Sequence, residues 1–381
     1  QTCLANLAIP ALPFEYDVLE LAIVDYKSDL IPIFQSDLWN KVKPLTDVEN
    51  VSGIPGLKFI DSIKLSTSIG FPLSGTKDKF VFIATKPEEL VEWHALYGGE
   101  PTAQELERLS ESYQVTKFIP EISEEIERIE SCYRKGQRGY PIAKACKKDE
   151  ILSKEKCRIF YGNAISLTYL IRKYFLPLMR VMQMNPLVSE CAVGINSHGP
   201  EWDEFYKYVT KHGMDRLIGG DYGKYDQKLP SQLIVAAMRI LIDCARCCDY
   251  TPEDLGIMEA MVGDIAYAVI AFNGDLIGLT EGTHISGNSL TVIINGICGS
   301  LNLRCYYYSV PENRSRRFRD DVALSTYGDD NIGSVSPNQK SFTIKGISEF
   351  LKKYGQTYTM PDKESELVDF LPPEEFEFLK R

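Results

Sequence analysis

The spacing of apolar residues along the chain predicts several amphipathic helices. Apolar side chains recur three and four positions apart, which places them on one face of a helix. This spacing predicts helices at residues 100–135, 165–184, 201–212, 231–248, 290–303 and 342–354. Proline breaks the first of these at Pro120 and is expected to kink the second at Pro177. Residues 1–75 are rich in Pro, Gly, Ser and Thr, so we expect loops with only short strands or helices there.

Short apolar runs beside turn residues predict strands. They lie at residues 216–220, 266–272, 276–279, 322–326 and 332–335. Asn273-Gly274-Asp275 links two of these strands and is typical of a tight hairpin turn. A second hairpin is expected around Tyr327-Gly328-Asp329-Asp330, with two carboxylates at its tip. Because helices and strands do not alternate regularly, the pattern favours an α+β fold over a doubly wound parallel sheet.

Length and composition are those of an ordinary globular protein. The chain has 381 residues, 44% of them hydrophobic and 25% charged, enough for a large core and more than one subdomain. No apolar run reaches the ~18 residues of a membrane-spanning helix, so no membrane anchor is expected. The N-terminus lacks Met and the basic start of a signal peptide, so we expect a processed product or a fragment. The ten cysteines are scattered and lack a matching histidine pattern, which favours reduced core thiols over disulfides or zinc.

Charge is unevenly distributed along the chain. The net charge is −11, which by itself argues against binding to nucleic acid. Residues 100–130 contribute −6 of this, with nine Glu against three basic residues. Residues 144–158 run the other way, with six Lys or Arg against three acidic residues. We therefore expect an acidic face and a separate basic patch that can contact phosphate groups.

Carboxylates at the ends of predicted strands form the first candidate site. Asp221 follows one strand and Asp226 lies five residues later, while Asp329 and Asp330 occupy the second hairpin. Two carboxylates about 4 Å apart repel by ~4 kcal/mol at an effective dielectric of about 20, so converging aspartates need a cation or a shared proton. Such carboxylates suit a pair of Mg²⁺ ions in phosphoryl transfer. Asp and Asn are also favoured in turns for conformational reasons alone, which leaves a purely structural interpretation open.

A glycine-containing loop before the predicted helix at 290–303 is the second candidate. Ser286-Gly287 would let backbone N–H groups approach phosphate or ribose at the helix N-terminus. Asn295 lies nine residues after Ser286 on that helix. The alternative is a flexible loop that only caps the helix, with Asn295 satisfied inside the core.

In order and spacing, these segments resemble motifs of positive-strand viral RNA-dependent RNA polymerases, most of all those of the picorna-like group (Picornavirales) and its marine type. GGDYGKYDQKLP resembles motif A, EGTHISGNSLTVIIN motif B and STYGDDN motif C. STSIGFP resembles motif G, KACKKDEILSKEKCRIF motif F, YTMPDKES motif D and FLKR motif E. A single motif is a weak signal, but seven in the family's order are specific. The resemblance covers residues 66–381.

The resemblance implies a role for each matching residue. Asp221 and Asp329 would be the main ligands of two Mg²⁺ ions, for which Mn²⁺ can substitute, and Asp330 an auxiliary ligand. Lys363 would be the general acid for the leaving pyrophosphate. The other implied sites are ribose and NTP contacts at Asp226, Ser286, Gly287, Thr291, Asn295, Lys148 and Arg158, and template and primer contacts at Ser68, Gly70, Lys380 and Arg381. Either Lys154 or Lys156 would also face the triphosphate.

The implied fold is an α+β right hand with fingers and palm. Fingers would take residues 1–185 and the 266–284 hairpin. The palm would take residues 186–265 and 285–381, with an antiparallel sheet flanked by helices. The family's thumb is expected to be absent, because motif E reaches the last residue.

The implied function is RNA-dependent RNA synthesis, which replicates a positive-strand viral genome from NTPs and releases pyrophosphate. The implied partners are an RNA template and primer, a genome-linked protein primer and other replication proteins, in replication complexes of the host cytoplasm. Three alternatives remain. The chain could be an inactive piece that binds RNA or NTP because the thumb is missing. A reverse transcriptase is disfavoured by Asp226, where that class places a bulky side chain. A structural protein requires Asp221 and Asp329 to lie far apart.

Overall fold

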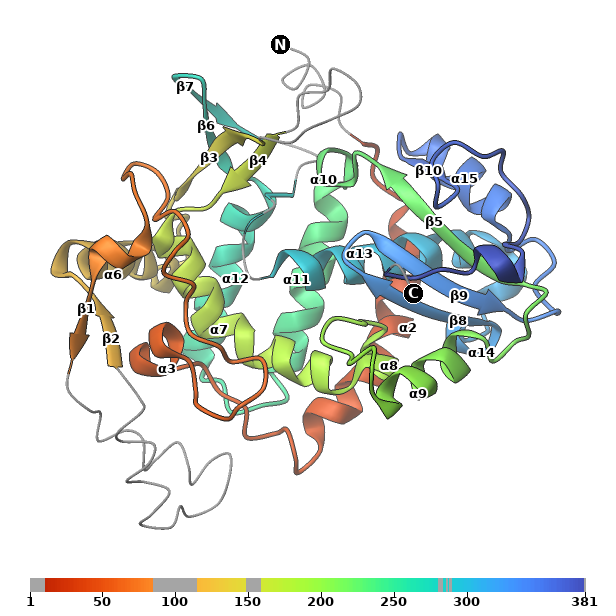
Figure 1. Cartoon of the computed structure of the whole chain (residues 1–381), viewed down its shortest axis with the longest axis horizontal. Coiled ribbons are helices and arrows are strands. Elements are labelled where there is room, and N and C mark those ends of the chain that lie inside the picture. Colours follow the sequence, from red (N-terminus) through yellow and green to blue (C-terminus); the bar gives the residue numbers. More distant parts are fainter. Residues whose placement is uncertain are drawn as a thin grey trace.

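Three β-sheets and a set of packed helices make up the computed structural model, which describes residues 11–84, 115–148, 159–279, 284–285, 287 and 290–379 (Figure 1). One sheet has four antiparallel strands in the order β10-β5-β9-β8. These strands are β5 (Leu217–Gly223), β8 (Val322–Tyr327), β9 (Asp330–Val335) and β10 (Thr357–Thr359). This sheet carries the candidate carboxylates.

A second four-stranded sheet has the order β4-β3-β6-β7, in which β3 and β6 are parallel and the other pairs antiparallel. Its strands are β3 (Ile142–Lys147), β4 (Ile159–Gly162), β6 (Val269–Phe272) and β7 (Asp275–Gly278). The β6–β7 hairpin predicted from Asn273-Gly274-Asp275 is confirmed, and it joins the strands that flank the basic segment. A third sheet pairs β1 (Val81–Ala84) with β2 (Val115–Phe118).

Helices fill the space around and beneath the sheets. They are α2 (Tyr16–Gln35), α3 (Asp47–Ser52), α6 (Pro120–Arg134), α7 (Ile165–Met184), α8 (Pro186–Ser189), α9 (Pro200–Val209), α10 (Tyr225–Lys228), α11 (Ser231–Ala245), α12 (Pro252–Ala266), α13 (Thr291–Ser309), α14 (Phe318–Asp321) and α15 (Ile344–Lys353). None of the helices in the described ranges is long and apolar enough to cross a lipid bilayer. The cysteines in the same ranges are free thiols.

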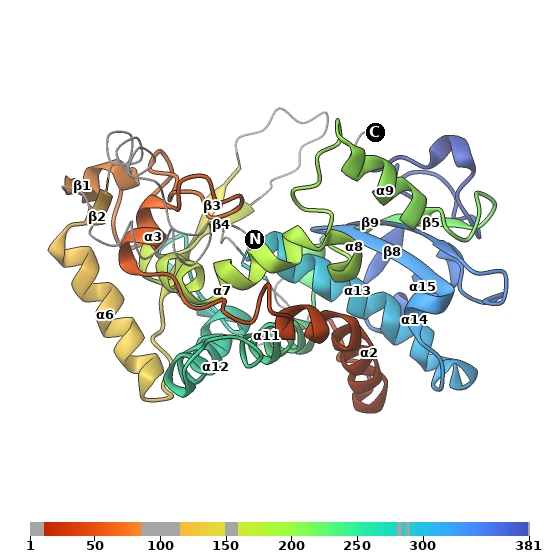
Figure 2. The ribbon, with the colours of Figure 1, turned by 90° about the horizontal axis from the view of Figure 1, so that it is seen from below.

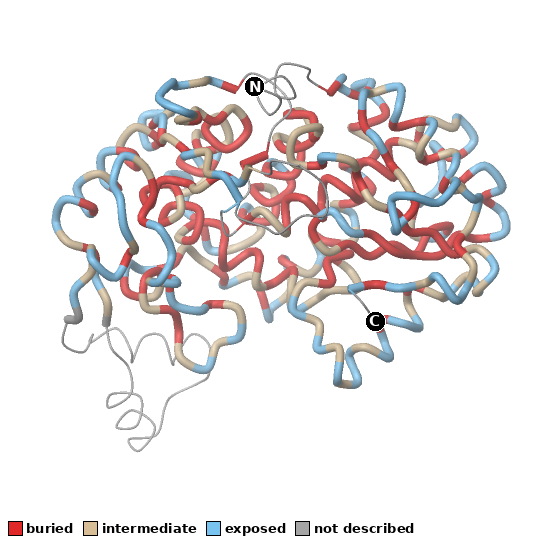
Figure 3. The backbone as a smooth tube through the Cα atoms, turned by 45° about the horizontal axis from the view of Figure 1, so that its top comes forward, coloured by how far each residue is buried: buried red, intermediate tan, exposed pale blue. Residues whose placement is uncertain are grey.

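The helix α13 lies at the centre of the core. It packs against α2, α11 and β8, and Figure 2 shows these helices side by side beneath the sheet. Every residue of α13 from 293 to 305 is buried, as expected for a helix surrounded by protein on all sides. Figure 3 shows buried backbone running through the middle of the molecule, with exposed segments at its edges. The centre of the fold is therefore next to the sheet that carries the carboxylates.

The prediction of loops and short elements in residues 1–75 is wrong for its first part. Residues 16–35 form α2, a helix of 20 residues. Its buried residues recur at helical spacing and include Val18, Ala22 and Tyr26. Pro32, one of the prolines of this region, lies in the last part of the helix. Burial of an apolar face against α13 outweighs the local signal of the proline.

Most predicted helices agree with the structure, but α12 was missed. The α7 helix has the predicted bounds, whereas the predicted strand at 266–272 begins only at Val269 because α12 extends to Ala266. A signal for α12 was present: Thr251 and Asp254 form a capping box around Pro252 at the first helical position. Within 100–135, residues 100–114 lie outside the described part, and α6 begins at Pro120.

Candidate active site

Two neighbouring strands bring the predicted carboxylates together at one end of the sheet. The antiparallel pairing of β5 with β9 ends at Gly220 opposite Asn331. Continuing this register by one residue places Asp221 opposite Asp330. Side chains in such positions have Cβ atoms about 4.5–5.5 Å apart. The structure therefore rules out the structural-protein alternative, in which these two elements would lie apart.

Asp329 completes this cluster from the turn of the β8–β9 hairpin. The register pairs Tyr327 with Asp330, so Gly328 and Asp329 form the two-residue loop. Gly328 has φ +64°, a left-handed conformation that glycine adopts without strain. The hairpin predicted around these residues is confirmed.

The three carboxylates influence one another electrostatically. Burial raises the pKa of Asp221, and the charge of Asp329 raises it further. Partial loss of solvent also raises the pKa of Asp330, as do the charges of Asp329 and Asp221. Because both shifts disfavour the ionised form, the cluster gains from any positive charge that binds to it.

Lys363 supplies a positive charge from the protein itself. Its Nζ atom lies 3.1 Å from Oδ2 of Asp221, and its side chain is 65% exposed. The residue stands in the turn after β10, where its backbone N–H donates to the carbonyl of Met360 at 2.9 Å and its φ is +67°. The predicted motif D lysine is therefore brought to the carboxylate cluster.

The donor set fits Mg²⁺ held partly by the protein and partly by a substrate. In the described part of the chain, no group of three or more His, Cys, Asp or Glu side chains is arranged to hold a metal ion. Mg²⁺ commonly takes only one or two protein carboxylates and completes its shell with water and substrate phosphates. Asp221 and Asp330, which lie on adjacent strands and have raised pKa values, match that requirement.

A cavity of about 850 Å³ opens beside these strand ends. It is lined by Asp221 and Asp330, by Lys363, and by the C-terminal segment that includes Glu375 and Phe378. The C-terminal segment is joined to the sheet by a hydrogen bond from the Leu371 N–H to the Leu217 carbonyl, at 2.8 Å. Asp221 and Asp330 thus border a space large enough for part of a nucleotide.

Tyr225, the residue before Asp226, contacts the predicted ribose-binding residue Asn295. Tyr225 donates from its hydroxyl to the backbone carbonyl of Asn295 at 2.8 Å, which ties α10 to α13. Oδ1 of Asn295 is buried and has no hydrogen-bond partner within the described ranges. A buried acceptor left unpaired costs about 1–3 kcal/mol, so this oxygen is available to a donor from a ligand.

The loop before α13 packs against the second sheet. Gly287 has φ +112°, and a Cβ there would lie 2.3 Å from the carbonyl oxygen of Tyr161 on β4. Only glycine therefore fits this close approach. Thr291 donates from its hydroxyl to the Ile285 carbonyl at 3.4 Å, and Lys148 is exposed just after β3. Of the other predicted contacts, Ser286, Arg158, Lys380 and Arg381 lie outside the described residues.

The predicted template contacts, Ser68 and Gly70, form a tight turn on the segment between β4 and α7. Gly70 has φ +93°, and a Cβ there would lie 2.4 Å from the carbonyl oxygen of Asn163. Ser68 accepts from the Gly70 N–H at 3.2 Å and from Nζ of Lys77 at 2.7 Å. This close approach places the turn beside the segment just before α7, and no hydrogen bond or ion pair in the described part of the chain joins it to the carboxylates.

Sequence reasoning missed two residues, Asn331 and Tyr358, whose contacts hold the backbone next to Asp221 and Asp330. Asn331 donates to the Gly220 carbonyl at 3.1 Å and accepts from the Tyr358 hydroxyl at 2.7 Å. The ring of Tyr358 lies against Gly220, where a Cβ would come within 2.4 Å of it. The glycine before Asp221 and the asparagine after Asp330 were the available signals.

The fold is that of a right-hand polymerase. The solved structure of the Sicinivirus 3Dpol RNA dependent RNA polymerase matches with a TM-score of 0.68 at 18% sequence identity. The match covers 97% of this chain and 68% of that chain. The predicted α+β fold class is thereby confirmed.

Residues 13–381 match the family model of viral RNA-dependent RNA polymerases, and the chain belongs to this family. The Genome polyprotein of Deformed wing virus is 28% identical over 384 residues, which is 98% of this chain and 12% of that protein. The RNA1 polyprotein of Tomato ringspot virus is 26% identical over 389 residues, with 98% and 16% coverage. The Replicase polyprotein of Cricket paralysis virus is 30% identical over 245 residues, with 59% and 13% coverage. The chain thus spans 12–16% of these relatives, and its resemblance to picorna-like viral polymerases is confirmed.

Proposed function

We propose that this chain catalyses RNA-templated nucleotidyl transfer in the replication of a positive-strand RNA virus. A primer 3′-hydroxyl attacks the α-phosphate of an NTP, and pyrophosphate leaves. The observation that carries the proposal is the position of Asp221 opposite Asp330, with Asp329 in the adjoining turn. Carboxylates from two separate motifs converge where phosphoryl transfer by this family would require them.

Asp221 and Asp329 are the proposed main ligands of two Mg²⁺ ions, with Asp330 as an auxiliary ligand. Bound Mg²⁺ would neutralise charge on the attacking and leaving oxygens. Burial and mutual repulsion raise the pKa of Asp221 and Asp330, and this supports cation binding because a divalent ion offsets both effects. Mn²⁺ has similar oxygen ligands and is expected to substitute.

Lys363 is the proposed general acid. Its exposed side chain can turn from Asp221 towards a leaving group that sits beside the carboxylates. A proton would pass from its Nζ to an oxygen of the pyrophosphate as the bond to the α-phosphate breaks. Contact with Asp221 holds the ammonium in place before the substrate arrives.

The ribose and triphosphate contacts are proposed from the matching motifs. Asp226 and Asn295 would bond the 2′-hydroxyl, and the buried, unpaired Oδ1 of Asn295 supports this because it lacks a donor in the described structure. A site that depends on such a bond discriminates against the deoxy analogue, which leaves the polar group unpaired. The remaining proposed contacts are Ser286, Gly287, Thr291, Lys148 and Arg158 for the NTP, and Ser68, Gly70, Lys380 and Arg381 for template and primer.

The organisation into subdomains is part of the proposal. Residues 1–185 and 266–284 would form fingers, and residues 186–265 and 285–381 the palm. A helical thumb, a genome-linked protein primer and other replication proteins would complete the machinery in host cytoplasmic replication complexes. RNA binding would depend on salt, because phosphate contacts dominate it.

The proposal is tested by primer extension on an RNA template with NTPs and Mg²⁺. Wild type should extend the primer, and Asp329→Asn should abolish extension. Asp275→Asn makes the same charge change at the exposed tip of β7 and should leave extension intact. If the wild-type chain binds RNA and NTP without extending the primer, the alternative hypothesis of an inactive binding fragment is correct. If it binds neither, the proposed function is wrong.

A further inference from the structure

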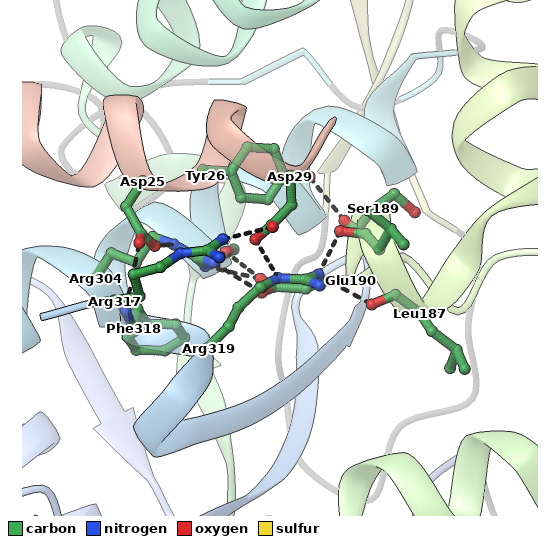
Figure 4. Close-up of polar contacts among 12 residues, drawn as sticks. Asp25, Tyr26, Asp29, Leu187, Ser189, Glu190, Arg304, Arg317, Phe318 and Arg319 are labelled. Atoms are coloured by element: carbon green, nitrogen blue, oxygen red, sulfur yellow. Dashed lines mark hydrogen bonds and ion pairs between the residues drawn. The ribbon is translucent and has the colours of Figure 1, made fainter. Parts of the chain in front are cut away.

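A buried cluster of charges lies beneath the carboxylate-bearing sheet (Figure 4). Arg304 of α13 is fully buried and donates to both carboxylate oxygens of Glu190, each at 2.8 Å. Its Nε donates to Oδ2 of Asp25 on α2 at 2.8 Å, and Ser300 donates to Glu190 at 2.6 Å. The bidentate contact fixes the orientation of both Glu190 and Arg304.

A second arginine balances the charge of this cluster. Nε of Arg319 lies 3.1 Å from Glu190 and 3.3 Å from Asp29. Burial alone would raise the pKa of Glu190, but the charges of Arg304 and Arg319 outweigh it, so the pKa is lowered. Glu190 therefore stays ionised, and removing either partner would leave a charge in the interior without compensation.

The backbone of Glu190 has an unusual conformation that serves the neighbouring strand. Its φ of +56° and ψ of 22° are left-handed, which costs a non-glycine residue about 1–2 kcal/mol. In this conformation its carbonyl accepts from both the backbone N–H and the hydroxyl of Thr326 on β8, each at 2.8 Å. The Ala192 N–H donates in turn to the Thr326 carbonyl at 2.8 Å. Residues 190–192 thus extend the sheet beside β8. They pair with it at Thr326, which is three positions before Asp329.

The Thr326 hydroxyl that donates to Glu190 also lies against α13. A Cβ added to Gly296 would lie 2.6 Å from the Thr326 hydroxyl, so the strand and helix approach each other closely there. Gly296 follows Asn295, and Arg304 lies on the same helix. The contacts therefore form a closed ring from Arg304 through Glu190 and Thr326 back to α13.

We propose that Glu190 is a positioning residue, which acts through Thr326 to hold the Asp329–Asp330 turn at a fixed distance from Asn295 on α13. This inference rests on the proposed function. The turn would hold the Mg²⁺ ions that act on the reacting phosphate, and Asn295 would bind the ribose of the same nucleotide, so their spacing sets both the rate and the preference for NTP over dNTP. A displacement of about 1 Å in such a site can lower the rate about 10²-fold.

The test removes the Thr326 hydroxyl, because Glu190→Gln would break the buried ion pairs with Arg304 and Arg319 and could prevent folding. Thr326→Val keeps the β-branched shape and loses the donor, and Thr326→Ser keeps the donor. Ser325→Ala is the matched control, because that adjacent buried hydroxyl has no hydrogen-bond partner in the described ranges. Each is compared with wild type for single-nucleotide incorporation of NTP and dNTP, and for hydrogen exchange at residues 295–299 and 327–331.

We expect Thr326→Val to lower kcat for NTP about 10- to 100-fold, to narrow the NTP-to-dNTP ratio, and to speed exchange in both segments. Thr326→Ser and Ser325→Ala should match wild type. The inference is overturned if Thr326→Val keeps the kcat and the NTP-to-dNTP ratio of wild type. It is also overturned if all three variants are impaired equally. If wild type itself incorporates no nucleotide, the proposed function fails. The exchange data then decide the positioning role, and unchanged exchange in Thr326→Val overturns it.

Discussion

Lys363 forms an ion pair with Asp221, with 3.1 Å between Nζ and Oδ2. The lysine comes from the turn after β10 and the aspartate from the end of β5, so the pair connects the predicted motifs D and A. Its positive charge opposes the burial and the Asp329 repulsion that raise the pKa of Asp221. A divalent cation at the carboxylates would compete with this lysine and release it for another role.

Two substitutions of Lys363 should distinguish the effect of its positive charge from its role as a proton donor. Lys363→Ala is expected to lower kcat about 10²–10⁴-fold, the usual contribution of a general acid. Lys363→Arg keeps the charge but cannot release a proton near neutral pH, so it should be impaired nearly as much. Lys345→Ala, an exposed lysine on α15, is the control. Steady-state incorporation rates check this, and a fully active Lys363→Arg would rule out proton donation.

The raised pKa of Asp330 makes stability depend on pH in a defined direction. A carboxyl whose pKa is higher in the folded state favours folding when protonated, and this contribution is lost as pH rises through the folded pKa. Asp330→Asn should therefore be more stable than wild type at pH 7 without metal. The difference should shrink as pH falls through the raised folded pKa towards the ordinary Asp value of 3.8, and it should change no further below that value.

Urea unfolding of Asp330→Asn and wild type at neutral and acidic pH measures this difference. Addition of Mg²⁺ at pH 7 should stabilise wild type more than the variant, because the ion replaces the missing counter-charge. Equal stability of the two proteins at neutral pH would contradict the repulsion inferred for the cluster.

Gly220 should be intolerant of any side chain. A Cβ would come within 2.4 Å of the Tyr358 ring, so Gly220→Ala must displace the tyrosine or β5. Overpacking of this kind costs about 1–3 kcal/mol. Gly256→Ala is the matched control, since a Cβ on that α12 residue meets no atom within 4 Å. The control should gain about 0.5–1 kcal/mol from helix propensity. The two substitutions should therefore change the free energy of unfolding in opposite directions.

Arg304 should be one of the residues most important for stability. Arg304→Met leaves Glu190 and Asp25 without their main counter-ion, and breaking a buried ion pair costs about 3–5 kcal/mol. Arg239→Met removes an arginine whose ion pair with Glu20 is at 3.5 Å and whose side chain is 60% exposed. That control should change the free energy of unfolding by no more than about 1 kcal/mol. Chemical denaturation checks both, and similar small effects would show that the cluster is not stabilising.

Local patterns in the sequence predict much of this molecule. Apolar spacing gives the bounds of α7, and turn residues give the β8–β9 hairpin with its two carboxylates. In α2, Pro and polar residues conceal an apolar face that is recognisable only once α13 is known to cover it. Local signals succeed where a short segment determines its own conformation, and they fail where a distant partner does.

The residues of the candidate site and of the cluster beneath it were likewise predictable only in part. Asp221 and Asp329 are predicted from their motifs, because Asp221 follows a recognisable apolar run and Asp329 occupies a recognisable turn. Glu190 and Arg304 are 114 positions apart, and Arg304 and Asp25 are 279 apart, so no local pattern connects them. The left-handed backbone of Glu190 is likewise invisible in sequence, since its neighbours contain no glycine to indicate it.

The most direct test of the account is a crystal structure of the protein soaked with Mn²⁺. Oxygens of Asp221 and Asp329 should both lie about 2.0–2.3 Å from a shared Mn²⁺, and Lys363 should have moved away from Asp221. Carboxylates that remain apart, with no ion between them and Lys363 still paired to Asp221, would contradict the proposed catalytic centre.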